Sequence, residues 1–463
     1  MSWRQAEALS YRLIRRDRGE RSAKSRATVS SRGLVWRAQV VVVGSVVPTP
    51  TEPARWTAVR ATTVFNKITA TLRVTVREIT FEGDNVVLGV RSAHRRLHCT
   101  CGWSTSSTYD RSMRRWRHLD VMGSRVFLEA EIRRLRCGAC ERVVTEAVAW
   151  ARHGARHTLP FEDVIAWWCQ RTDRTSVSDY WRCDWATVTA IVVRVVGEHL
   201  AESRLDGLTR IGVDEIAWAK GNRYLTIVVN QTGGDVIWVG EGKNADVLEE
   251  FYTLLGQERC SQLSAVSMDM GRAYSAATRA KTKATICWDP FHVVKLLNKA
   301  VADTIRWSNL THRGLPLTKQ ESTDLRWAML KKASNHTDAQ AAVLARHRKA
   351  RHACWRAQQL KEDFRGLYQL EDPEDAAAYL NRWIARACRC RIPPMLKAVK
   401  MVREQRVGIL AAVELGLSNS RLEGTNSKIR VINHRGYGHH TAEALTAMIY
   451  LCCSDIDIQL PWR

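Results

Sequence analysis

The chain has 463 residues, of which 45% are hydrophobic, so it is long enough for two or three domains with buried cores, and global disorder is excluded. Its 71 Lys and Arg residues outnumber its 47 Asp and Glu residues, and the formal net charge of +24 favours a polyanionic partner, above all nucleic acid. A protein that is basic for solubility alone, or that binds anionic membranes, is the alternative.

The first apolar run of the chain, between Val40 and Val47, is far shorter than the roughly 20 residues that a membrane helix needs. We therefore expect a soluble protein. The 13 cysteines occur without a secretory signal, and four of them form two tight clusters, so a reducing cytoplasm fits better than an oxidising compartment.

Residues 1–62 are basic, rich in Ser, Thr and Val, and show no sustained periodicity, so we assign them no fold. Two interpretations stay open. The segment is a flexible basic arm, or it is a stretch upstream of a misplaced start site.

Residues 63–150 are predicted to form a small metal-binding module of short strands, for example Leu72–Ile79 and Asn85–Val90. Between and after the strands, two cysteine pairs lie about 35 residues apart. Four such thiolates commonly close a tetrahedral structural zinc site, so we predict Zn²⁺ at these four residues: Cys99, Cys101, Cys137 and Cys140.

Two points leave this ligand set open. The first pair, Cys99-Thr-Cys101, is one residue tighter than the usual C-x-x-C, which makes His98 a possible substitute ligand. Unligated cysteines are also often small buried hydrophobic residues. Between the pairs, a basic run from Arg111 to His118 contains Arg114 and Arg115, which are candidates for phosphate contacts or for a solvated basic face.

Residues 158–203 are predicted to form a helix-turn-helix DNA-binding domain. Two apolar segments, Phe161–Gln170 and Trp185–Leu200, are joined by a polar stretch. Asp184 is the expected N-cap of the second helix, which resembles a recognition helix and places Arg194 among the candidate DNA contacts.

Residues 208–302 change to a pattern of strands followed by alternating helices and strands. Three β-rich runs predict an antiparallel meander, and they are Ile211–Ile216, Tyr224–Val229 and Val236–Val239. The following expected elements are a helix at 245–255, a strand at 265–268, a helix at 272–280, a strand at 285–288 and a long helix from Pro290. This order is typical of an α/β RNase H-like catalytic core. We expect an all-helical insertion at 303–416 and the last part of the core at 417–455.

Three acidic residues are candidates for a functional site because of where they lie in the sequence. Asp214 lies inside an apolar strand, Asp269 ends another, and Glu423 begins a helix after the insertion. Converging carboxylates suit two Mg²⁺ or Mn²⁺ ions, which take oxygen ligands and bridge phosphate oxygens, so phosphodiester chemistry is the natural use. Three basic residues near the third acid are candidate phosphate contacts: Arg421, Lys428 and Arg430. Arg421 precedes Glu423 by two residues, and the other two follow it.

Other readings of this acidic region stay open. Ser420 and Glu423 also form the S-x-x-E pattern of a capping box, which needs no metal. Strand alternation points Glu215 to the opposite face from Asp214, so we expect only one of the two at a metal site. Asp289 and His292 are expected to be structural or supporting residues rather than catalytic ones.

Four motifs, in this order, resemble the transposases of the ISL-three (ISL3) insertion-sequence family: Ile211-Gly-Val-Asp-Glu-Ile216, Ser267-Met-Asp-Met270, Trp288 to Lys295, and Ser418 to Arg430 followed by Arg435-Gly-Tyr-Gly438. The resemblance covers roughly residues 64–451. It implies a DDE catalytic core in which Asp214, Asp269 and Glu423 take the three acidic positions. The C-x-C pair and residues 1–62 depart from it.

This resemblance implies a transposase that cuts DNA at terminal inverted repeats and transfers the freed ends to target DNA without a covalent protein intermediate. Because two ends must be handled together, we expect a homodimer or a larger homo-oligomer. We expect it in the bacterial cytoplasm, associated with the nucleoid. The alternative is a DNA-binding regulator that retains the domains of a transposase but does not cut.

Overall fold

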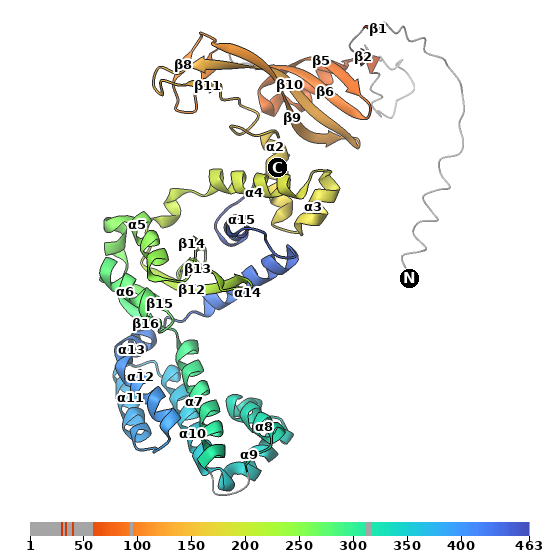
Figure 1. Cartoon of the computed structure of the whole chain (residues 1–463). Coiled ribbons are helices and arrows are strands. Elements are labelled where there is room, and N and C mark those ends of the chain that lie inside the picture. The colour runs from red at the N-terminus through yellow and green to blue at the C-terminus, as the bar shows by residue number, and fades with distance from the viewer. Residues whose placement is uncertain are drawn as a thin grey trace, which may run out of the picture. The chain divides into compact units, whose positions relative to one another are not determined.

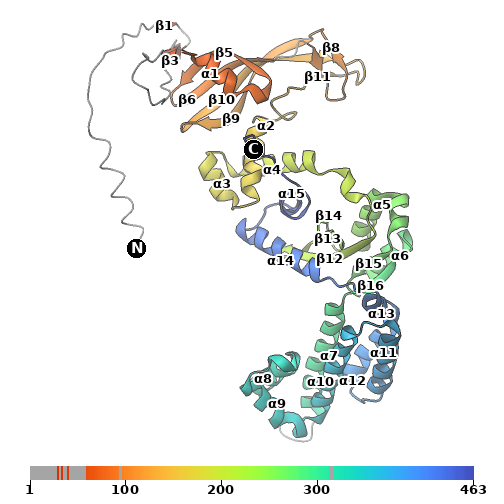
Figure 2. The ribbon, with the colours of Figure 1, turned by 180° about the vertical axis from the view of Figure 1, so that it is seen from behind.

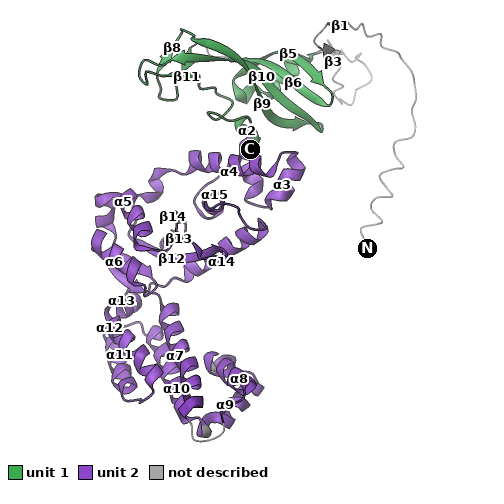
Figure 3. Ribbon diagram, in the orientation of Figure 1, with its two compact units in different colours: residues 1–161 green, residues 162–463 purple. Residues whose placement is uncertain are grey.

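Figure 1 shows a computed structural model of the chain, which describes residues 29–30, 33–34, 39–40, 59–92, 96–311 and 316–462. The chain divides into two compact units, residues 1–161 and residues 162–463 (Figure 3). The expectations for residues 1–62 fall mostly outside the described residues. Among the helices of the described residues, none is both long and apolar enough to cross a membrane.

The first unit is mainly β-structure. Its elements are β1 (Val29–Ser30), β2 (Gly33–Leu34), β3 (Gln39–Val40), β4 (Val59–Arg60), α1 (Ala61–Ile68), the 3-10 turn η2 (Ala70–Leu72), β5 (Val74–Glu82), β6 (Asn85–Ser92), β7 (Leu97–His98), β8 (Ser104–Thr105), β9 (Asp110–Val121), β10 (Ser124–Arg136) and β11 (Val143–Thr145). The main sheet has the order β11-β10-β6-β5, and β9 pairs with β10. The two strands predicted from the sequence are therefore present, whereas α1 was not predicted.

Strands β9 and β10 form a long hairpin joined by Met122 and Gly123. Both turn residues have positive φ, 50° and 84°, which gives the turn the twist that matches right-handed strands. Along β10, alternate residues such as Leu128 and Ile132 are buried in the core with Trp116 of β9. This hairpin carries the second cysteine pair at its end.

The second unit begins with three helices, α2 (Leu159–Cys169, which starts at the end of the first unit), α3 (Arg174–Trp181) and α4 (Trp185–His199), followed by the turn η3 (Glu202–Leu205). Asp184 is the N-cap of α4, and its carboxylate accepts a hydrogen bond from the Thr187 backbone N–H at 2.7 Å, as predicted. The sequence did not predict α3, because it is only eight residues long and mostly polar.

A five-stranded sheet forms the centre of the second unit. Its strands are β12 (Arg210–Ala219), β13 (Arg223–Asn230), β14 (Val236–Glu241), β15 (Ala265–Met268) and β16 (Thr285–Trp288), in the order β14-β13-β12-β15-β16. The first three strands are antiparallel, whereas β15 and β16 run parallel to β12 and to each other. The predicted meander and both later strands are confirmed.

Helices cover both faces of this sheet (Figures 1 and 2). Helices α5 (Ala245–Gln262) and α6 (Arg272–Lys281) pack on one face, which includes Val213 of β12. Helices α14 (Ser420–Arg435) and α15 (Ala442–Cys453) lie against the other. Gly212 permits the close approach of α14, since a Cβ there would lie 2.5 Å from Leu422 Cδ1. Because side chains alternate along a strand, Asp214 points to the same face as Gly212.

Helices alone follow β16 up to α14 within the described residues. They are α7 (Pro290–Thr311), α8 (Lys319–Leu330), the turn η4 (Ala333–Asn335), α9 (Asp338–Ala350), α10 (His352–Arg365), the turn η5 (Gly366–Gln369), α11 (Pro373–Cys388), α12 (Pro393–Glu404) and α13 (Arg406–Glu414). Helix α7 starts at the sheet and packs against α10 and α12. One hydrophobic cluster contains both Phe251 beside the sheet and Trp383 among these helices, so the helices share the core of the sheet.

Candidate active site and metal centre

A cavity of about 580 Å³ in the second unit brings the three predicted acids together. Asp214 comes from β12, Asp269 follows β15, and Glu423 lies in the first turn of α14. The cavity is also lined by Glu215, Asp289, Pro290, Phe291, His292, Lys295, Ser418, Asn419, Ser420, Asn426 and Arg430. Residues more than 200 positions apart in the chain thus converge on one hollow.

Asp214 is held by two hydrogen bonds. Its Oδ1 accepts from the Glu215 backbone N–H at 2.8 Å, and its Oδ2 accepts from Asn426 Nδ2 at 2.8 Å. Burial raises the pKa of the Asp214 carboxyl above its usual range, and the negative charges of Asp269 and Asp289 add to this rise. A carboxylate in this position is costly unless a cation compensates it.

Asp269 lies at the turn between β15 and α6. Its Oδ1 accepts a hydrogen bond from the Gly271 backbone N–H at 3.1 Å, and a Cβ on Gly271 would lie only 2.8 Å from the same oxygen. The glycine therefore leaves room for the carboxylate at the edge of the cavity.

Helix α14 places Glu423 at the cavity. The helix begins at Ser420 with Asn419 as its N-cap, and no side chain caps it. A capping box would require Ser420 to be the N-cap, so the capping-box interpretation of Glu423 is wrong. The Glu423 side chain is exposed and faces the cavity.

Asp289 links the starts of two helices. Its side chain is almost fully buried, its Oδ1 accepts from the Asn419 backbone N–H at 3.0 Å, and its Oδ2 lies 2.8 Å from His292 Nδ1. This hydrogen bond and the charge of Asp289 raise the pKa of His292. Asp289 thus fixes the start of α14, which carries Glu423, and favours a positive charge on His292 beside the cavity.

Glu215 lines the same cavity as Asp214, although the two side chains leave β12 on opposite faces, and the prediction that only one of them serves a metal site stays a prediction. The reason lies in the length of the strands. The pairing of β12 with β15 ends at Gly212, while β12 continues for seven residues beside β13. Past the end of β15, both faces of β12 reach the cavity. Burial raises the pKa of Glu215, and the charge of Asp269 raises it further.

Asn426 is a residue that the sequence reasoning missed. It is 3% exposed, donates to Asp214, and its Oδ1 has no hydrogen-bond partner among the described residues. It follows Glu423 by three residues and therefore lies on the same face of α14. This three-residue spacing from Glu423 could have predicted that Asn426 lies at the site.

The predicted DNA contacts of the second unit divide into two groups. Arg430 lines the cavity of the three acids. Three others make contacts within the fold. Arg421 donates to the Gln231 carbonyl at 2.9 Å, Lys428 donates to the Cys452 carbonyl, and Arg194 donates to the buried Glu162 carboxylate at 3.0 Å. These hydrogen bonds tie Arg421 to the loop after β13, Lys428 to α15 and Arg194 to α2, and the predicted contacts of the three residues with DNA stay predictions.

In the first unit, Arg115 bonds to Glu82 at 2.7 Å and to Glu129 at 2.9 Å, which raises its pKa. These ion pairs link neighbouring strands. A phosphate that binds Arg115 would have to compete with both carboxylates. Arg114 is exposed and lines a separate cavity of about 290 Å³.

The four predicted zinc ligands converge at one end of the first unit. Their sulfur atoms all lie within 4.8 Å of one another, and Cys101 Sγ and Cys137 Sγ are 3.6 Å apart. Four sulfurs at about 2.3 Å from a tetrahedral Zn²⁺ are separated by roughly 3.8 Å, so the set fits this ion. His98 is outside the set, which resolves the alternative left open by the C-x-C pair.

Backbone turns hold both cysteine pairs. The Cys99 N–H bonds to the Trp103 carbonyl at 2.8 Å, and the Cys140 N–H points at Cys137 Sγ at 3.3 Å. A hydrogen bond from the Cys101 backbone lowers the pKa of the Cys99 thiol to about 7, whereas a side-chain hydrogen bond with Cys101 raises the pKa of Cys140 to about 12, so within the cluster the thiolate is favoured at Cys99. The four cysteines could hold a structural rather than a catalytic zinc ion, since four protein ligands leave no open position.

Comparison with known proteins supports the same three parts. Residues 211–449 match the transposase model of the ISL3 family of DDE transposases, which covers about half of the chain. Residues 98–140 match the zinc finger of the transposases of IS204, IS1001, IS1096 and IS1165, and residues 146–196 match the helix-turn-helix domain of the ISL3 transposase family.

Two curated relatives are transposases by name. The chain is 34% identical to the transposase for insertion sequence element IS1557 of Mycobacterium tuberculosis, over 84% of this chain and 95% of that protein. It is 27% identical to the transposase for insertion sequence element IS1001 of Bordetella parapertussis, over 74% of this chain and 85% of that protein.

Proposed function

Because the chain belongs to the ISL3 family of transposases, we propose that it cuts DNA at both ends of an insertion sequence and joins the freed ends to target DNA through Asp214, Asp269 and Glu423. The chain is a transposase, an enzyme that acts on DNA. The observation that carries the proposed site is the convergence of these three acids on one cavity from β12, β15 and α14.

We assign the central sheet to the RNase H-like fold. The strand order β14-β13-β12-β15-β16, with three antiparallel strands followed by two parallel ones, supports this assignment. We keep the predicted domains as zinc module 63–150, helix-turn-helix 158–203, core 208–302 and 417–455, and helical insertion 303–416. Helix α7 crosses residue 303, so the core and the insertion share one continuous helix.

The three carboxylates suit two Mg²⁺ or Mn²⁺ ions. They do not all lie within 4.8 Å of one another, unlike the four thiolates of the zinc site. Carboxylates spread around the cavity in this way would hold two ions between them rather than one ion at a single point. When bound, the ions would activate the attacking oxygen and stabilise the charge on the phosphate and on the leaving oxygen.

The remaining side chains position these groups. Asn426 holds Asp214 in place, and Asp289 fixes the start of α14 and hence Glu423. Arg430, Lys295 and His292, whose pKa is raised by Asp289, lie around the same cavity, where their positive charge would neutralise the phosphate of the DNA. Because the chemistry needs positioning and charge neutralisation, we expect no covalent bond between protein and DNA.

The match to a helix-turn-helix domain supports DNA binding, and we propose that this domain and the zinc module recognise the terminal inverted repeats. Within the first unit, Arg114 remains a proposed contact. Two ends must be cut in one complex, so we propose a homodimer or larger homo-oligomer. Since the substrate is chromosomal DNA, we place the protein in the bacterial cytoplasm, at the nucleoid.

Excision in cells tests this function. A plasmid carries a marker between the two end sequences of the element, taken from the DNA that flanks the gene. Expression of the wild-type protein is expected to excise the marker, and Asp269→Asn is expected to abolish excision while the protein still binds the ends. Binding of the ends without excision by the wild type would instead support a regulator derived from a transposase.

A further inference from the structure

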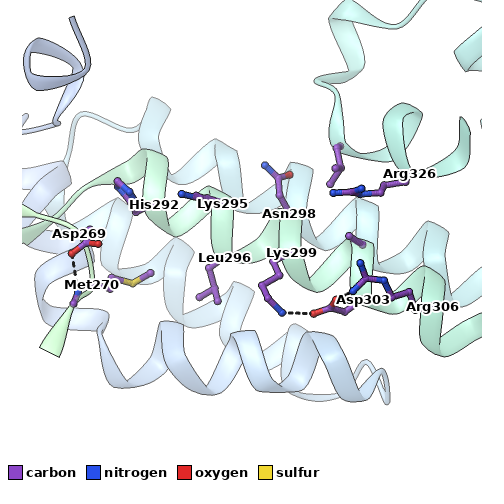
Figure 4. Close-up of a pocket in the computed structure, with 13 residues that line it drawn as sticks. Asp269, Met270, His292, Lys295, Leu296, Asn298, Lys299, Asp303, Arg306 and Arg326 are labelled. Atoms are coloured by element: carbon purple, nitrogen blue, oxygen red, sulfur yellow. Dashed lines mark hydrogen bonds and ion pairs between the residues drawn. The ribbon is translucent and has the colours of Figure 1, made fainter. Parts of the chain in front are cut away.

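A second cavity, of about 620 Å³, runs along one face of α7 in the second unit (Figure 4). We call it the α7 groove. It is lined by residues of the β15–α6 turn, of α7 and of α8: Asp269, Met270, Gly271, His292, Lys295, Leu296, Asn298, Lys299, Ala302, Asp303, Arg306, Arg326 and Leu330. In Figure 4, Asp269 and His292 lie at one end of it, and Arg306 and Arg326 lie at the other.

The α7 groove adjoins the cavity of the three acids. Asp269, His292 and Lys295 line both cavities. Any polymer that places a phosphodiester beside Asp269 therefore has a hollow path that leads away from it along α7. The inference rests on the proposed function to this extent, because it takes the first cavity as the site of the reacting phosphate.

The charges of the α7 groove suit a polyanion. Lys295 and Lys299 are exposed on α7, Arg306 follows further along the helix, and Arg326 faces them from α8 (Figure 4). Asp303 pairs with Lys299 at 2.7 Å and with Arg306 at 3.0 Å. Both basic side chains are 74% exposed, and such surface pairs contribute only about 0–1 kcal/mol, so phosphates can replace the carboxylate as partners.

The length of the α7 groove fits a stretch of DNA strand. Lys295 and Arg306 are eleven residues apart on one helix, which corresponds to about 16 Å. Since a DNA duplex rises about 3.4 Å per base pair along its axis, this length matches roughly five base pairs. Asn298 lies between them, and its buried Oδ1 has no hydrogen-bond partner among the described residues, so it is open to a donor on a sugar or base.

We propose that the α7 groove binds the backbone of the DNA strand that adjoins the phosphate to be cut, within about five nucleotides of it. The helices after β16 then have a substrate-holding role, and Lys299, Arg306 and Arg326 are positioning residues. A groove that served a compact anion would need its basic groups around one point, whereas here they extend along the helix.

Photo-crosslinking tests the location. A photoreactive p-benzoylphenylalanine replaces Lys299 in the full chain, and the probe is a labelled duplex that spans the element boundary, without divalent metal. We expect crosslinks within about five nucleotides of the boundary. The control places the same group at Lys400 of α12, which is 71% exposed and also paired i,i+4 with an acid. Crosslinks elsewhere, or equal crosslinks from both positions, would overturn the proposal.

The salt dependence of binding tests the charge. Lys299→Gln with Arg306→Gln is compared with Lys400→Gln and Arg403→Gln, two exposed basic residues of α12 outside the groove. Each lost phosphate contact lowers the slope of log K against log salt by about 0.9 on duplex DNA. We expect the groove variant to lose about 1.8 units of slope and the control to lose none, with both proteins melting near the wild-type temperature. An unchanged slope in the groove variant would contradict the proposal.

The crosslinking and salt-dependence tests can fail or succeed independently of the proposed cleavage. A wild-type protein that cuts no DNA with any metal, while position 299 still crosslinks to the boundary, would refute the proposed catalysis but keep the groove. A wild type that cuts, with a groove variant that cuts equally well and no crosslink from position 299, would refute the groove alone.

Discussion

Asp214 is a carboxylate that the fold disfavours in its charged form. A carboxyl whose pKa is raised in the folded protein binds its proton more tightly there than in the unfolded chain. At pH values above this raised pKa, the ionised group therefore costs folding free energy, and the cost disappears below the unfolded pKa, near 4. Carboxylates that destabilise the folded state in this way are typical of functional sites, where a residue is kept for its chemistry rather than for stability.

We predict that Asp214→Asn raises Tm at pH 7 in the absence of divalent metal. The amide cannot ionise, and Asn426 can rotate its own amide so that the free Oδ1 accepts from the new side chain. The gain should shrink as the pH falls toward 4. Mg²⁺ should raise the Tm of the wild type and leave that of the variant unchanged. Thermal melts at several pH values measure this, and a lower Tm for the metal-free variant would count against the argument.

At the scale of elements, the close contact between β12 and α14 sets the spacing of the acids. We predict that Gly212→Ala pushes α14 away from β12, because the Cβ of the alanine would lie 2.5 Å from Leu422 Cδ1 and from Gln231 Nε2. Such overpacking costs about 1–3 kcal/mol, and Tm falls by roughly 2–4 °C per kcal/mol. Cleavage should fall more than stability explains, since Glu423 moves with α14.

The matched control for this change is Gly197→Ala in α4, where nothing lies within 4 Å of the added Cβ. An alanine there should stabilise the helix by about 0.5–1 kcal/mol and leave cleavage unchanged. Equal effects of both substitutions on activity would show that the approach of α14 to β12 is unimportant.

The elements that the sequence predicted best are those with strong patterns. The strands Ala265–Met268 and Thr285–Trp288 have the predicted bounds, because short apolar runs between turn signals are typical of strands buried on both faces. The sequence missed α3, because a short polar helix has little apolar periodicity and depends on its contacts with α4.

The site was predicted less completely than the fold. Asp214, Asp269 and Glu423 stood out because a charge in or beside an apolar run is costly. The place of Glu215 depends on where β15 stops pairing with β12, and the ion pairs of Arg115 and Arg194 depend on partners remote in sequence. Such tertiary contacts leave no local pattern, so the sequence could not predict them.

At the scale of the whole molecule, the chain combines a metal-stabilised unit with a unit that has a large hydrophobic core. We predict that Cys137→Ser, or removal of Zn²⁺ by a chelator, unfolds the zinc end of the first unit, because structural zinc contributes folding free energy directly. Specific binding of the element ends should weaken, while the second unit keeps its Mg²⁺-dependent rise in Tm.

Cys260→Ser is the control for this prediction, since Cys260 is buried in the second unit away from the zinc ligands. It should leave the zinc content unchanged. Zinc analysis, calorimetry and binding assays on the same samples measure the effect. Full binding by a protein freed of zinc would contradict a structural role for the metal.

The most direct test of the account is cleavage of a labelled duplex that carries the element end, with Mg²⁺ or Mn²⁺, by the wild type and by Asp214→Asn, Asp269→Asn and Glu423→Gln. The account predicts metal-dependent nicking at the element boundary and a loss of at least about 100-fold in each variant, since the ions supply several kcal/mol to the transition state. All three variants should still bind the duplex. Undiminished nicking by any one of them would contradict the assignment of the three acids to one catalytic site.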